Sequence, residues 1–386
     1  MEEVPDIQKV IEKMLVDKLD TTVVNQDSVV NQVVEIAPEM QDIPNDKIAK
    51  WISDYKQVVL FDKIAGLMYG CALGDCIGLP FEGRSTEHIK SLPTPPIVGL
   101  PQRNYRGITQ GDWSDDTDQL ILLMDVLTEN KLNFNTRSFA RKLYSWKKTG
   151  FKELGDTQGL GCGSLTGRVL SKENFIDNPM HCAIKTYKEL GCISAPNGAV
   201  MRCGISAVSS DWQKTAIMQS IVTHVDARCI YSAWLVTAMC RSLFRNIIPT
   251  NESLLKNKND FIKRVHTDEF NKYQRIYDGA TDKMLEKLDL GNDEGMGYTL
   301  KALGVAFYAL ANIRDGKINN ATDYKRFQLE IVNKGGDADT NAAISGQVLG
   351  SYLGYSKLPK DWISGLIHKK WLDVKIIKLY EVIVKL

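Results

Sequence analysis

Four glycines recur at intervals of four residues in one apolar segment: Gly66, Gly70, Gly74 and Gly78. The apolar residues between them have helical spacing, which predicts a helix from about Phe61 that Pro80 ends. Each glycine in a helix interior costs about 1 kcal/mol relative to alanine, so four of them require a reason. A stripe without side chains lets another helix backbone approach closely. A predicted helix over 341–354 repeats such a stripe: Ala342, Gly346, Gly350 and Gly354.

The other periodic segments are also helical. Apolar spacing predicts helices over 116–127, 215–245 with one break, and 297–311. Strand-like alternation is scarce, and there is no βαβ rhythm. We therefore expect an all-α protein in which residues 61–386 form a single compact, orthogonal multi-helix domain. Residues 1–60 would be an acidic N-terminal appendage, helical or partly disordered.

Charge and cysteine usage narrow the possible partners. The net charge is +1, which implies neither nucleic acid nor membrane. Residues 1–60 contain twelve acidic and six basic residues, so the remainder is mildly basic. That suits an anionic ligand such as a diphosphate, unless the acidic segment is only a solvated tail.

Eight cysteines occur without a C-x-x-C or zinc spacing, as expected of free thiols in a reducing compartment. The N-terminus has no secretory signal, and no run approaches the ~20 apolar residues of a membrane span. A cytoplasmic location is expected, and a nuclear one is possible.

The segment Trp113–Asp118 places Asp115 and Asp116 directly after Ser114. Adjacent carboxylates repel one another in a low dielectric, so they are solvated, cap a helix or bind a cation. One interpretation is a helix start, with Ser114 as N-cap and the acids favoured by the helix dipole. A cation site is the other, and the motif alone leaves both open.

A second acidic motif, Asp337-Ala338-Asp339-Thr340, follows Gly335 and Gly336. Its D-x-D-x-N pattern resembles the start of an EF-hand, but Ala342 stands where that loop needs glycine and Val348 where it needs glutamate. A helix cap again remains possible. Together, however, the two motifs offer four carboxylates and two hydroxyls, an oxygen-only set that favours Mg²⁺ or Mn²⁺. This is enough for two ions about 3.5–4 Å apart.

Two small-residue loops, 159–164 and 194–199, precede predicted helical turns. Such loops present backbone N–H groups to anions, although simple turns are the plainer interpretation. Arg202 and Arg228 are candidate anion partners or surface charges. His224 lies at a predicted helix start, where a packed or capping histidine is the ordinary expectation.

Five motifs occur in a recognisable order: Gly70–Asp75 leading to Glu82, Ser114–Thr117, Asn197–Arg202, Thr223-His224 and Gly335–Ala343. From about Asp62 to Leu358 the chain resembles the ADP-ribosylglycohydrolases, the family that includes dinitrogenase reductase-activating glycohydrolase. The resemblance does not cover residues 1–60. It implies an all-α domain with two Mg²⁺ or Mn²⁺ ions in a cleft. It also implies a glycosidase that cleaves the N- or O-glycosidic bond between ADP-ribose and a protein side chain, or acts on an ADP-ribose polymer or derivative.

The resemblance also implies roles for single residues. The metal ligands would be Ser114, Asp115, Asp116, Asp337, Asp339 and Thr340. Glu82 would be the carboxylate beside the metals and, with Asp115 and Asp116, would carry the catalysis. The substrate would be held by Gly161, Gly163, Ser164, Ser194, Asn197, Gly198 and His224. A monomer acting on an ADP-ribosylated protein or an ADP-ribose derivative is expected, without nucleic acid or membrane.

Two positions depart from the family pattern. Ser114 stands where threonine is usual, which keeps the hydroxyl but loses a stiffening methyl group. Ala195-Pro196 replaces an aromatic residue that stacks on adenine in some members, which leaves Tyr298 as a loose candidate for that role.

Two other functions stay open. One is a catalytically silent ADP-ribose-binding or crystallin-like structural protein of the same fold, and the other is a different two-metal hydrolase such as a phosphatase. The presence of every ligand-type residue and of Glu82 favours an active enzyme.

Overall fold

The computed structural model describes residues 45–91, 109–255, 267–292 and 295–386, with side chains described from residue 56 onward. Within these ranges the chain is helical and forms no strand, only the isolated bridges Arg84–Gly336 and Pro196–Tyr298. The predicted all-α class is confirmed. Most of the segment 1–60, predicted to be helical or partly disordered, lies outside the described residues.

The α-helices are α2 (Asn45–Gly78), α3 (Thr86–Ser91), α4 (Asp115–Glu129), α5 (Thr136–Thr149), α6 (Ser164–Leu170), α7 (Pro179–Glu189), α8 (Trp212–Ile221), α9 (Ala227–Phe244), α10 (Asn251–Leu255), α12 (Thr267–Tyr277), α13 (Thr281–Leu288), α14 (Thr299–Arg314), α15 (Ala321–Val332), α16 (Ala338–Leu353), α17 (Lys360–Ser364) and α18 (Lys369–Val384). The 3₁₀ turns are η1 (Leu79–Phe81), η2 (Lys152–Leu154), η3 (Asn197–Ala199), η4 (Gly204–Val208) and η5 (Tyr355–Lys357). The break predicted within 215–245 separates α8 from α9.

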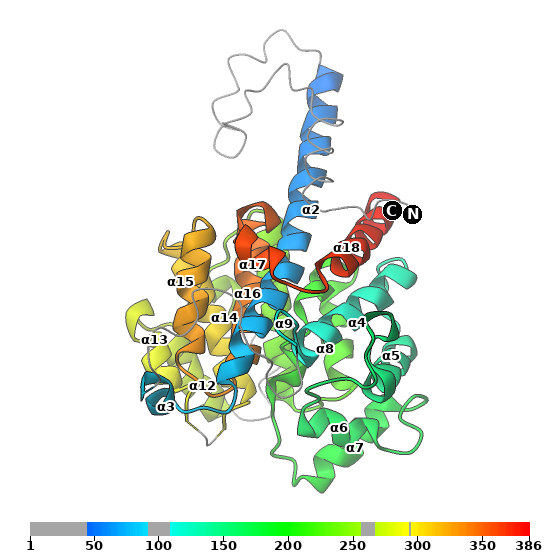
Figure 1. Ribbon diagram of the computed structural model, residues 1–386, viewed down its shortest axis with the longest axis vertical. Coiled ribbons are helices and arrows are strands. Elements are labelled where there is room, and N and C mark those ends of the chain that lie inside the picture. Colours follow the sequence, from blue (N-terminus) through cyan, green and yellow to red (C-terminus); the bar gives the residue numbers. More distant parts are fainter. Residues whose placement is uncertain (1–44, 92–108, 256–266, 293–294) are drawn as a thin grey trace.

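The two glycine stripes explain the centre of the fold, because they pack against each other. Helices α2 and α16 lie side by side there (Figure 1), and their contact is the most extensive between any two described elements. A Cβ atom added at Gly70 would lie 2.1 Å from the carbonyl oxygen of Gly346, and one at Gly350 would lie 1.9 Å from that of Gly66. No side chain fits at these positions, so the stripes set the spacing of the two helices.

Helix α2 differs from the prediction in two respects. It begins at Asn45, so the proposed boundary at residue 60 falls within a continuous helix (Figure 1). The segment Lys56–Phe81, which runs from α2 into η1, is also long and apolar enough to cross a membrane, contrary to the expectation from the sequence. However, 94% of the most apolar window is buried inside the protein, as in the core helix of a globular domain. The hydropathy therefore reflects a helix surrounded by other helices.

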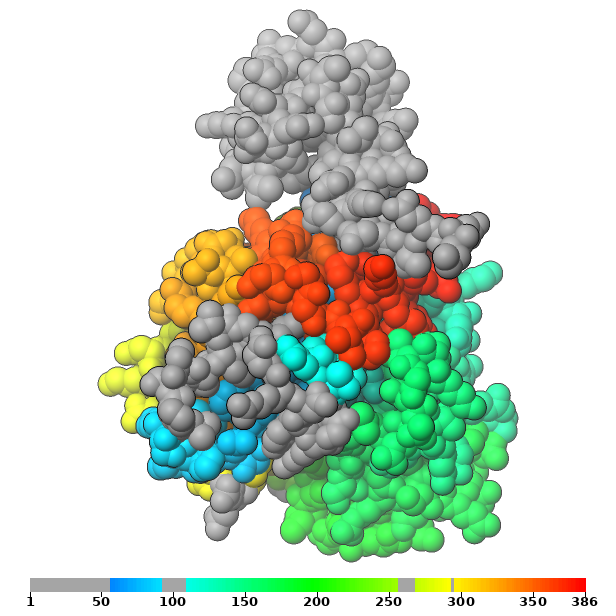
Figure 2. All heavy atoms as spheres, in the orientation of Figure 1, coloured from blue at the N-terminus to red at the C-terminus, as the bar shows by residue number. Residues whose placement is uncertain are grey.

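The C-terminal helix joins the body through contacts with distant segments. The ring of Trp371 in α18 lies 4.8 Å from that of Phe151, and Lys375 pairs with Asp125 of α4 at 2.7 Å. Figure 2 shows these C-terminal residues, in red, beside the green segment that follows α4 in the sequence. All eight cysteines are free, and six of them are buried, as predicted for reduced thiols.

Candidate metal centre and substrate cavity

Both acidic motifs begin helices, but neither uses its side chain to cap its own helix. Ser114 and Asp337 occupy the N-cap positions of α4 and α16, and neither side chain accepts a hydrogen bond from the first turn. The helix-cap interpretation is therefore right about where these residues lie, at the starts of two helices. It does not explain their side chains, which do not cap those helices. Their oxygens are directed to other partners.

Asp75 of α2 caps α4 in place of Ser114. Its carboxylate accepts hydrogen bonds from the backbone N–H groups of Ser114 and Thr117, at 3.1 and 3.0 Å. It also accepts from both hydroxyls, each at 2.7 Å. Asp75 is fully buried. Asp75 was not among the predicted site residues, although an aspartate beside a glycine stripe in an apolar helix was a signal.

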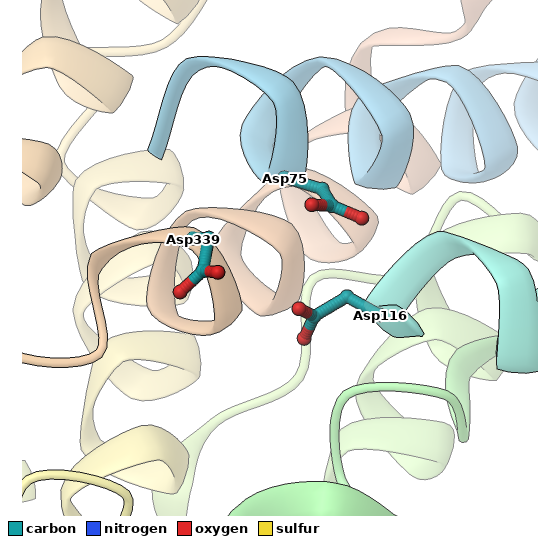
Figure 3. A group of neighbouring side chains, drawn as sticks. All are labelled: Asp75, Asp116 and Asp339. Carbon is teal, nitrogen blue, oxygen red and sulfur yellow. The ribbon is translucent and has the colours of Figure 1, made fainter. Parts of the chain in front are cut away.

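Three carboxylates from three different helices converge at this point (Figure 3). Oxygen atoms of Asp75 in α2, Asp116 in α4 and Asp339 in α16 lie within 4.8 Å of one another, and all three residues are buried. Burial raises the pKa of Asp75 to about 6. Burial, together with the charges of the neighbouring aspartates, raises the pKa values of Asp116 and Asp339 well above the usual range.

These residues fit a divalent cation. One oxygen of Asp116, Oδ1, is buried and has no hydrogen-bond partner in the described residues. An unpartnered buried carboxylate oxygen is costly unless a cation or donor compensates it, and an all-oxygen set suits Mg²⁺ or Mn²⁺. The oxygens of Asp75 already accept from Ser114 and Thr117, so we assign Asp75 to holding the ligand-bearing helix. Asp116 Oδ1 is the oxygen of this group that is left without a donor.

Glu82 is brought to the same place by a backbone pairing. The turn at Gly335 and Gly336 has φ of +72° and +67°, which glycine adopts without strain. Gly336 exchanges hydrogen bonds with the segment just after Glu82: Gly83 N–H donates to its carbonyl, and its own N–H donates to Arg84, both at 2.8 Å. The start of α16 and the end of η1 are therefore fixed next to each other.

A cavity of about 140 Å³ gathers most of the predicted site residues. Its walls include Glu82, Asp115, Asp116, Gly161, Gly163, Ser164, Asn197, Gly198, His224, Asp337, Asp339 and Thr340. Ser114 lies behind the wall, bonded to Asp75, and Ser194 does not line the cavity. Leu165, Thr166, Pro196 and Met201 also line it and were not singled out from the sequence. Two larger cavities elsewhere contain none of the predicted residues.

The loop before α6 contacts Asp115. A Cβ atom at Gly161 would lie 2.5 Å from Asp115 Oδ1, and the backbone of Gly163 hydrogen-bonds the same carboxylate. Gln119 donates to Asp115 Oδ2 at 3.1 Å. Burial and the charge of Asp75 raise the pKa of Asp115 to about 8 in spite of these donors. At least one backbone N–H of this loop is therefore already used by the protein.

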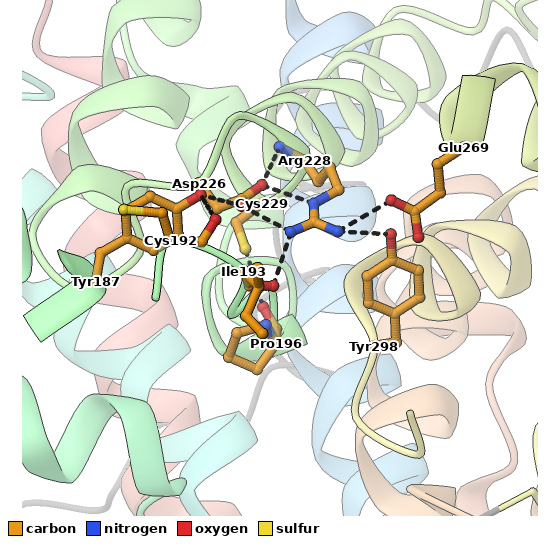
Figure 4. A network of polar contacts seen from close by, with 9 residues as sticks. All are labelled: Tyr187, Cys192, Ile193, Pro196, Asp226, Arg228, Cys229, Glu269 and Tyr298. Carbon is orange, nitrogen blue, oxygen red and sulfur yellow. Dashed lines mark hydrogen bonds and ion pairs between the residues drawn. The ribbon is translucent and has the colours of Figure 1, made fainter. Parts of the chain in front are cut away.

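Arg228 holds the start of the loop 194–198 through the neighbouring residue Ile193, as Figure 4 shows. The buried guanidinium of Arg228 pairs with Asp226 and Glu269, and it donates to the carbonyl of Ile193 at 2.9 Å. Arg228 is thus not a surface charge. It also donates to the hydroxyl of Tyr298, which is half-buried and does not line the cavity.

The loop 194–198 also contacts the second acidic motif, Asp337–Thr340. Asn197 Nδ2 donates to Asp337 Oδ2 at 2.7 Å, and the Asn197 N–H donates to the carbonyl of Gly297 at 2.9 Å. Asn197 therefore connects the predicted substrate loop to a predicted metal ligand. This contact depends on the fold, and nothing in either motif alone indicated it.

The buried carboxylates lead to a prediction for the metal-free protein. Its free energy of unfolding should fall as the pH rises from about 5 to 8. The pKa values of Asp75 and Asp115 in the folded protein, about 6 and about 8, exceed the ~3.9 of an exposed aspartate. The stabilising contribution of such a group is complete below the unfolded pKa and is lost as the pH rises through the folded one.

Urea unfolding in EDTA at several pH values measures this slope, and repeating it with Mg²⁺ should remove most of it. A metal-free protein that becomes more stable between pH 5 and 8 would contradict the expectation.

The fold and the cavity define a class: all-α proteins that gather carboxylates from several helix ends at one small-residue-lined site. The ADP-ribosylglycohydrolase family matches residues 56–385, and the chain belongs to this family. The resemblance inferred from the five motifs is thereby confirmed, over a slightly longer stretch than predicted.

Several relatives are similar to this protein over most of its length. An uncharacterized protein of Archaeoglobus fulgidus is 26% identical over 83% of this chain and 96% of its own length. The ADP-ribosylarginine hydrolase Tri1 of Pseudomonas putida is 24% identical over 78% of this chain and 73% of its own. The ADP-ribosylhydrolase ARH3 of Homo sapiens is 24% identical, over 78% and 88%.

A solved structure described as an ADP-ribosylglycohydrolase-related protein complex has the same fold. Its TM-score is 0.57 at 20% identity, over 84% of this chain and 98% of that one.

Proposed function

We propose that this protein is a metal-dependent hydrolase that cleaves the glycosidic bond between ADP-ribose and a protein side chain, or a bond in an ADP-ribose polymer or derivative. It would thereby reverse ADP-ribosylation. The names of the relatives, ADP-ribosylarginine hydrolase and ADP-ribosylhydrolase, support this bond class. One observation carries the proposal: the buried carboxylates of both acidic motifs share a cavity with two small-residue loops and a histidine. A substrate that joins a ribose to a diphosphate needs both features: the carboxylates for the metal ions at the ribose, and the loops for the diphosphate.

Two Mg²⁺ or Mn²⁺ ions would be held by Ser114, Asp115, Asp116, Asp337, Asp339 and Thr340. When bound, they would supply positive charge that stabilises negative charge on oxygens of the substrate. Ser114 suits this role because its hydroxyl gives its hydrogen to Asp75 at 2.7 Å, which leaves lone pairs for a cation. The replacement of the usual threonine by Ser114 is thus compatible with metal binding.

Glu82 is our candidate for proton transfer, together with the carboxylates of Asp115 and Asp116. The departure of a group from the anomeric carbon of a ribose passes through an oxocarbenium-like transition state, and carboxylates stabilise its positive charge. Glu82 would take a proton from the attacking water or give one to the leaving atom. The pairing of Gly83 and Arg84 with Gly336 keeps Glu82 beside Asp337 for this purpose.

The size of the cavity bears on how the substrate lies. At about 140 Å³ it is smaller than the ~300–1,000 Å³ of typical ligand pockets. It would enclose the reacting ribose and the ions, while the loops at 161–164 and 194–198 face the diphosphate. The adenine would extend beyond the enclosed part, where the chain lacks the aromatic loop residue of some relatives.

The decisive experiment is a substrate panel of Arg-, Ser- and Asp/Glu-linked ADP-ribose and poly(ADP-ribose), with Mg²⁺ or with EDTA. We expect release of ADP-ribose from at least one substrate with Mg²⁺, and its loss in EDTA and in Asp337→Ala. Binding of ADP-ribose without release from any substrate would indicate a silent member of the family. Metal-dependent release of phosphate from a phosphoester, without ADP-ribose release, would indicate a phosphatase. Full activity of Asp337→Ala would refute the shared metal site.

The remaining expectations belong to the same proposal. We propose a monomer located in the cytoplasm, or in the nucleus, that acts on its modified target without binding nucleic acid or membrane. Residues 1–60 would form a separate acidic segment, with its boundary displaced by the early start of α2. Sedimentation of the full chain tests the monomer.

A further inference from the structure

A buried cation without a counter-ion lies beneath the cavity. Arg202 follows η3, its side chain is fully buried, and it forms no ion pair with a carboxylate of the described residues. Among the described residues its guanidinium donates to neutral groups of three residues, Gln119, Gln219 and Thr223, and it lies 5.2 Å from the centre of the neutral Phe139 ring. Because burying a charge is costly unless it is paired, an arginine held by neutral acceptors alone needs an explanation beyond packing.

The first contact from Arg202 leads to His224 and determines where the histidine carries its proton. Arg202 Nη2 donates to Thr223 Oγ1 at 2.7 Å, and Thr223 Oγ1 lies 2.7 Å from His224 Nδ1. These are the two partners of the Thr223 hydroxyl among the described residues. Since arginine can only donate, the hydroxyl accepts from it, and Nδ1 is the one remaining partner among the described residues that can accept the hydroxyl hydrogen. His224 Nδ1 is therefore an acceptor, and the proton of the neutral ring lies on Nε2.

The protonated nitrogen lies on the edge of the ring beside Gly198, a residue that also lines the cavity. Gly198 lies against the Cε1–Nε2 edge, where an added Cβ would come within 2.9 and 3.0 Å of these two atoms. His224 lines the cavity, is itself buried, and has no described hydrogen-bond partner at Nε2. Burial and the charge of Arg202 hold the pKa of His224 well below its usual range, so the ring stays neutral. The cavity thus receives an N–H donor from a neutral imidazole.

The second contact from Arg202 leads to the acidic side of the cavity. Arg202 Nη1 donates to Gln119 Oε1 at 2.6 Å, which fixes the amide so that Nε2 donates to Asp115 Oδ2 at 3.1 Å. One guanidinium therefore orients two groups that line the cavity, His224 through Thr223 and Asp115 through Gln119.

We infer that Arg202 is a positioning residue that fixes His224 as a neutral Nε2–H donor toward the substrate and holds Asp115 through Gln119. This inference rests on the proposed function, in which the acceptor is an oxygen of the ADP-ribose unit. His224 then binds substrate by donating a hydrogen bond and takes no part as a general base. If Arg202 served only to fill space, neither the hydroxyl of Thr223 nor a single tautomer of His224 would be required.

Substitution of Arg202 itself would remove its contacts with Gln119, Gln219 and Thr223 at once. Substitution of Thr223 tests the path to His224 alone. Thr223→Val removes the hydroxyl at nearly constant shape, and Thr223→Ser keeps it. The full chain is labelled with ¹⁵N-histidine, and His224→Gln identifies the His224 signals among the five histidines. Ring-nitrogen chemical shifts report the tautomer, and calorimetry reports the Kd for ADP-ribose with Mg²⁺.

In the wild type and in Thr223→Ser we expect an unprotonated Nδ1 and a protonated Nε2. In Thr223→Val the Nδ1–H tautomer should become populated, and the Kd should rise about tenfold, as expected for one lost hydrogen bond. Thr223→Ser should stay within about twofold of the wild type.

A wild-type protein with its proton on Nδ1 would overturn the inference, as would a Thr223→Val variant with an unchanged tautomer or an unchanged Kd. The wild-type shifts decide the tautomer even if Thr223→Val does not fold. Absence of ADP-ribose binding by the wild type would count against the proposed function, while the ring-nitrogen shifts would still decide the state of His224.

Discussion

Replacement of Asp116 by asparagine is expected to abolish metal-dependent hydrolysis and, at the same time, to make the metal-free protein more stable. Asp116 is buried against Asp75, Asp115 and Asp337, and its Oδ1 has no partner among the described residues. Asparagine has the same shape without the charge, so the repulsion disappears together with the ligand. We expect activity to fall by more than about 100-fold, the upper cost of losing an outer-shell partner of a metal. The free energy of unfolding in EDTA should rise by at least about 1 kcal/mol, the equivalent of one pKa unit.

The replacement of Asp118 by asparagine, two residues further along α4, provides a matched control. Asp118 is also buried in α4, but both of its oxygens accept hydrogen bonds from indole N–H groups, Trp113 at 2.9 Å and Trp146 at 2.7 Å. Asp118→Asn turns an amide N–H₂ toward one indole donor and should destabilise the protein by about 1–3 kcal/mol. Thermal unfolding with EDTA and with Mg²⁺ distinguishes the two variants. If Mg²⁺ stabilises Asp116→Asn as much as the wild type, Asp116 is not a ligand.

The second large effect is expected at the contact between α2 and α16. A Cβ atom at Gly346 would lie 2.0 Å from the carbonyl oxygen of Gly70, far inside any contact that real Cβ atoms make. Gly346→Ala must therefore push the two helices apart. We expect the free energy of unfolding to fall by about 3 kcal/mol or more, the upper range for overpacking, although alanine itself favours a helix by about 1 kcal/mol. Because α16 carries Asp339 and α2 carries Asp75, the response to Mg²⁺ should weaken as well.

Gly167 in α6 is the corresponding control for urea unfolding. It is also a helical glycine, but an added Cβ would meet only Cys162 Sγ, at 3.9 Å. Gly167→Ala should be neutral or stabilising by up to about 1 kcal/mol, because helix propensity acts there without a clash. Equal losses of stability in the two variants would mean that the close approach of α2 and α16 is not what the glycines provide.

Much of the fold could be anticipated because its signals are local. Helical spacing indicated α4, the break between α8 and α9, α14 and α16, and both glycine stripes were visible in the sequence. The two acidic motifs could be paired because each offers the same oxygen donors at a helix start. The structure brings them to one cavity, and Ser114 and Ser194 are the predicted site residues that do not line it.

The remaining features depend on contacts between distant segments. Asp75 belongs to no acidic run, and its role as the cap of α4 exists only once α2 lies beside Ser114. Arg202 looked like an anion partner or a surface charge, whereas its contacts with Gln119 of α4 and Gln219 of α8 require these two helices to meet around it. The early start of α2 was hidden because turn-prone residues precede Asn45.

The packing of α2 on α16 also has a consequence for biosynthesis. The two helices come from opposite ends of the chain, so most of the polypeptide is made before α16 can cover α2. At ~5–20 residues per second, translation of the intervening segment takes on the order of tens of seconds. During that time the nascent chain displays a long apolar helix whose partner has not yet left the ribosome. We therefore expect the growing chain to need shielding by chaperones, and chains truncated before α16 to aggregate.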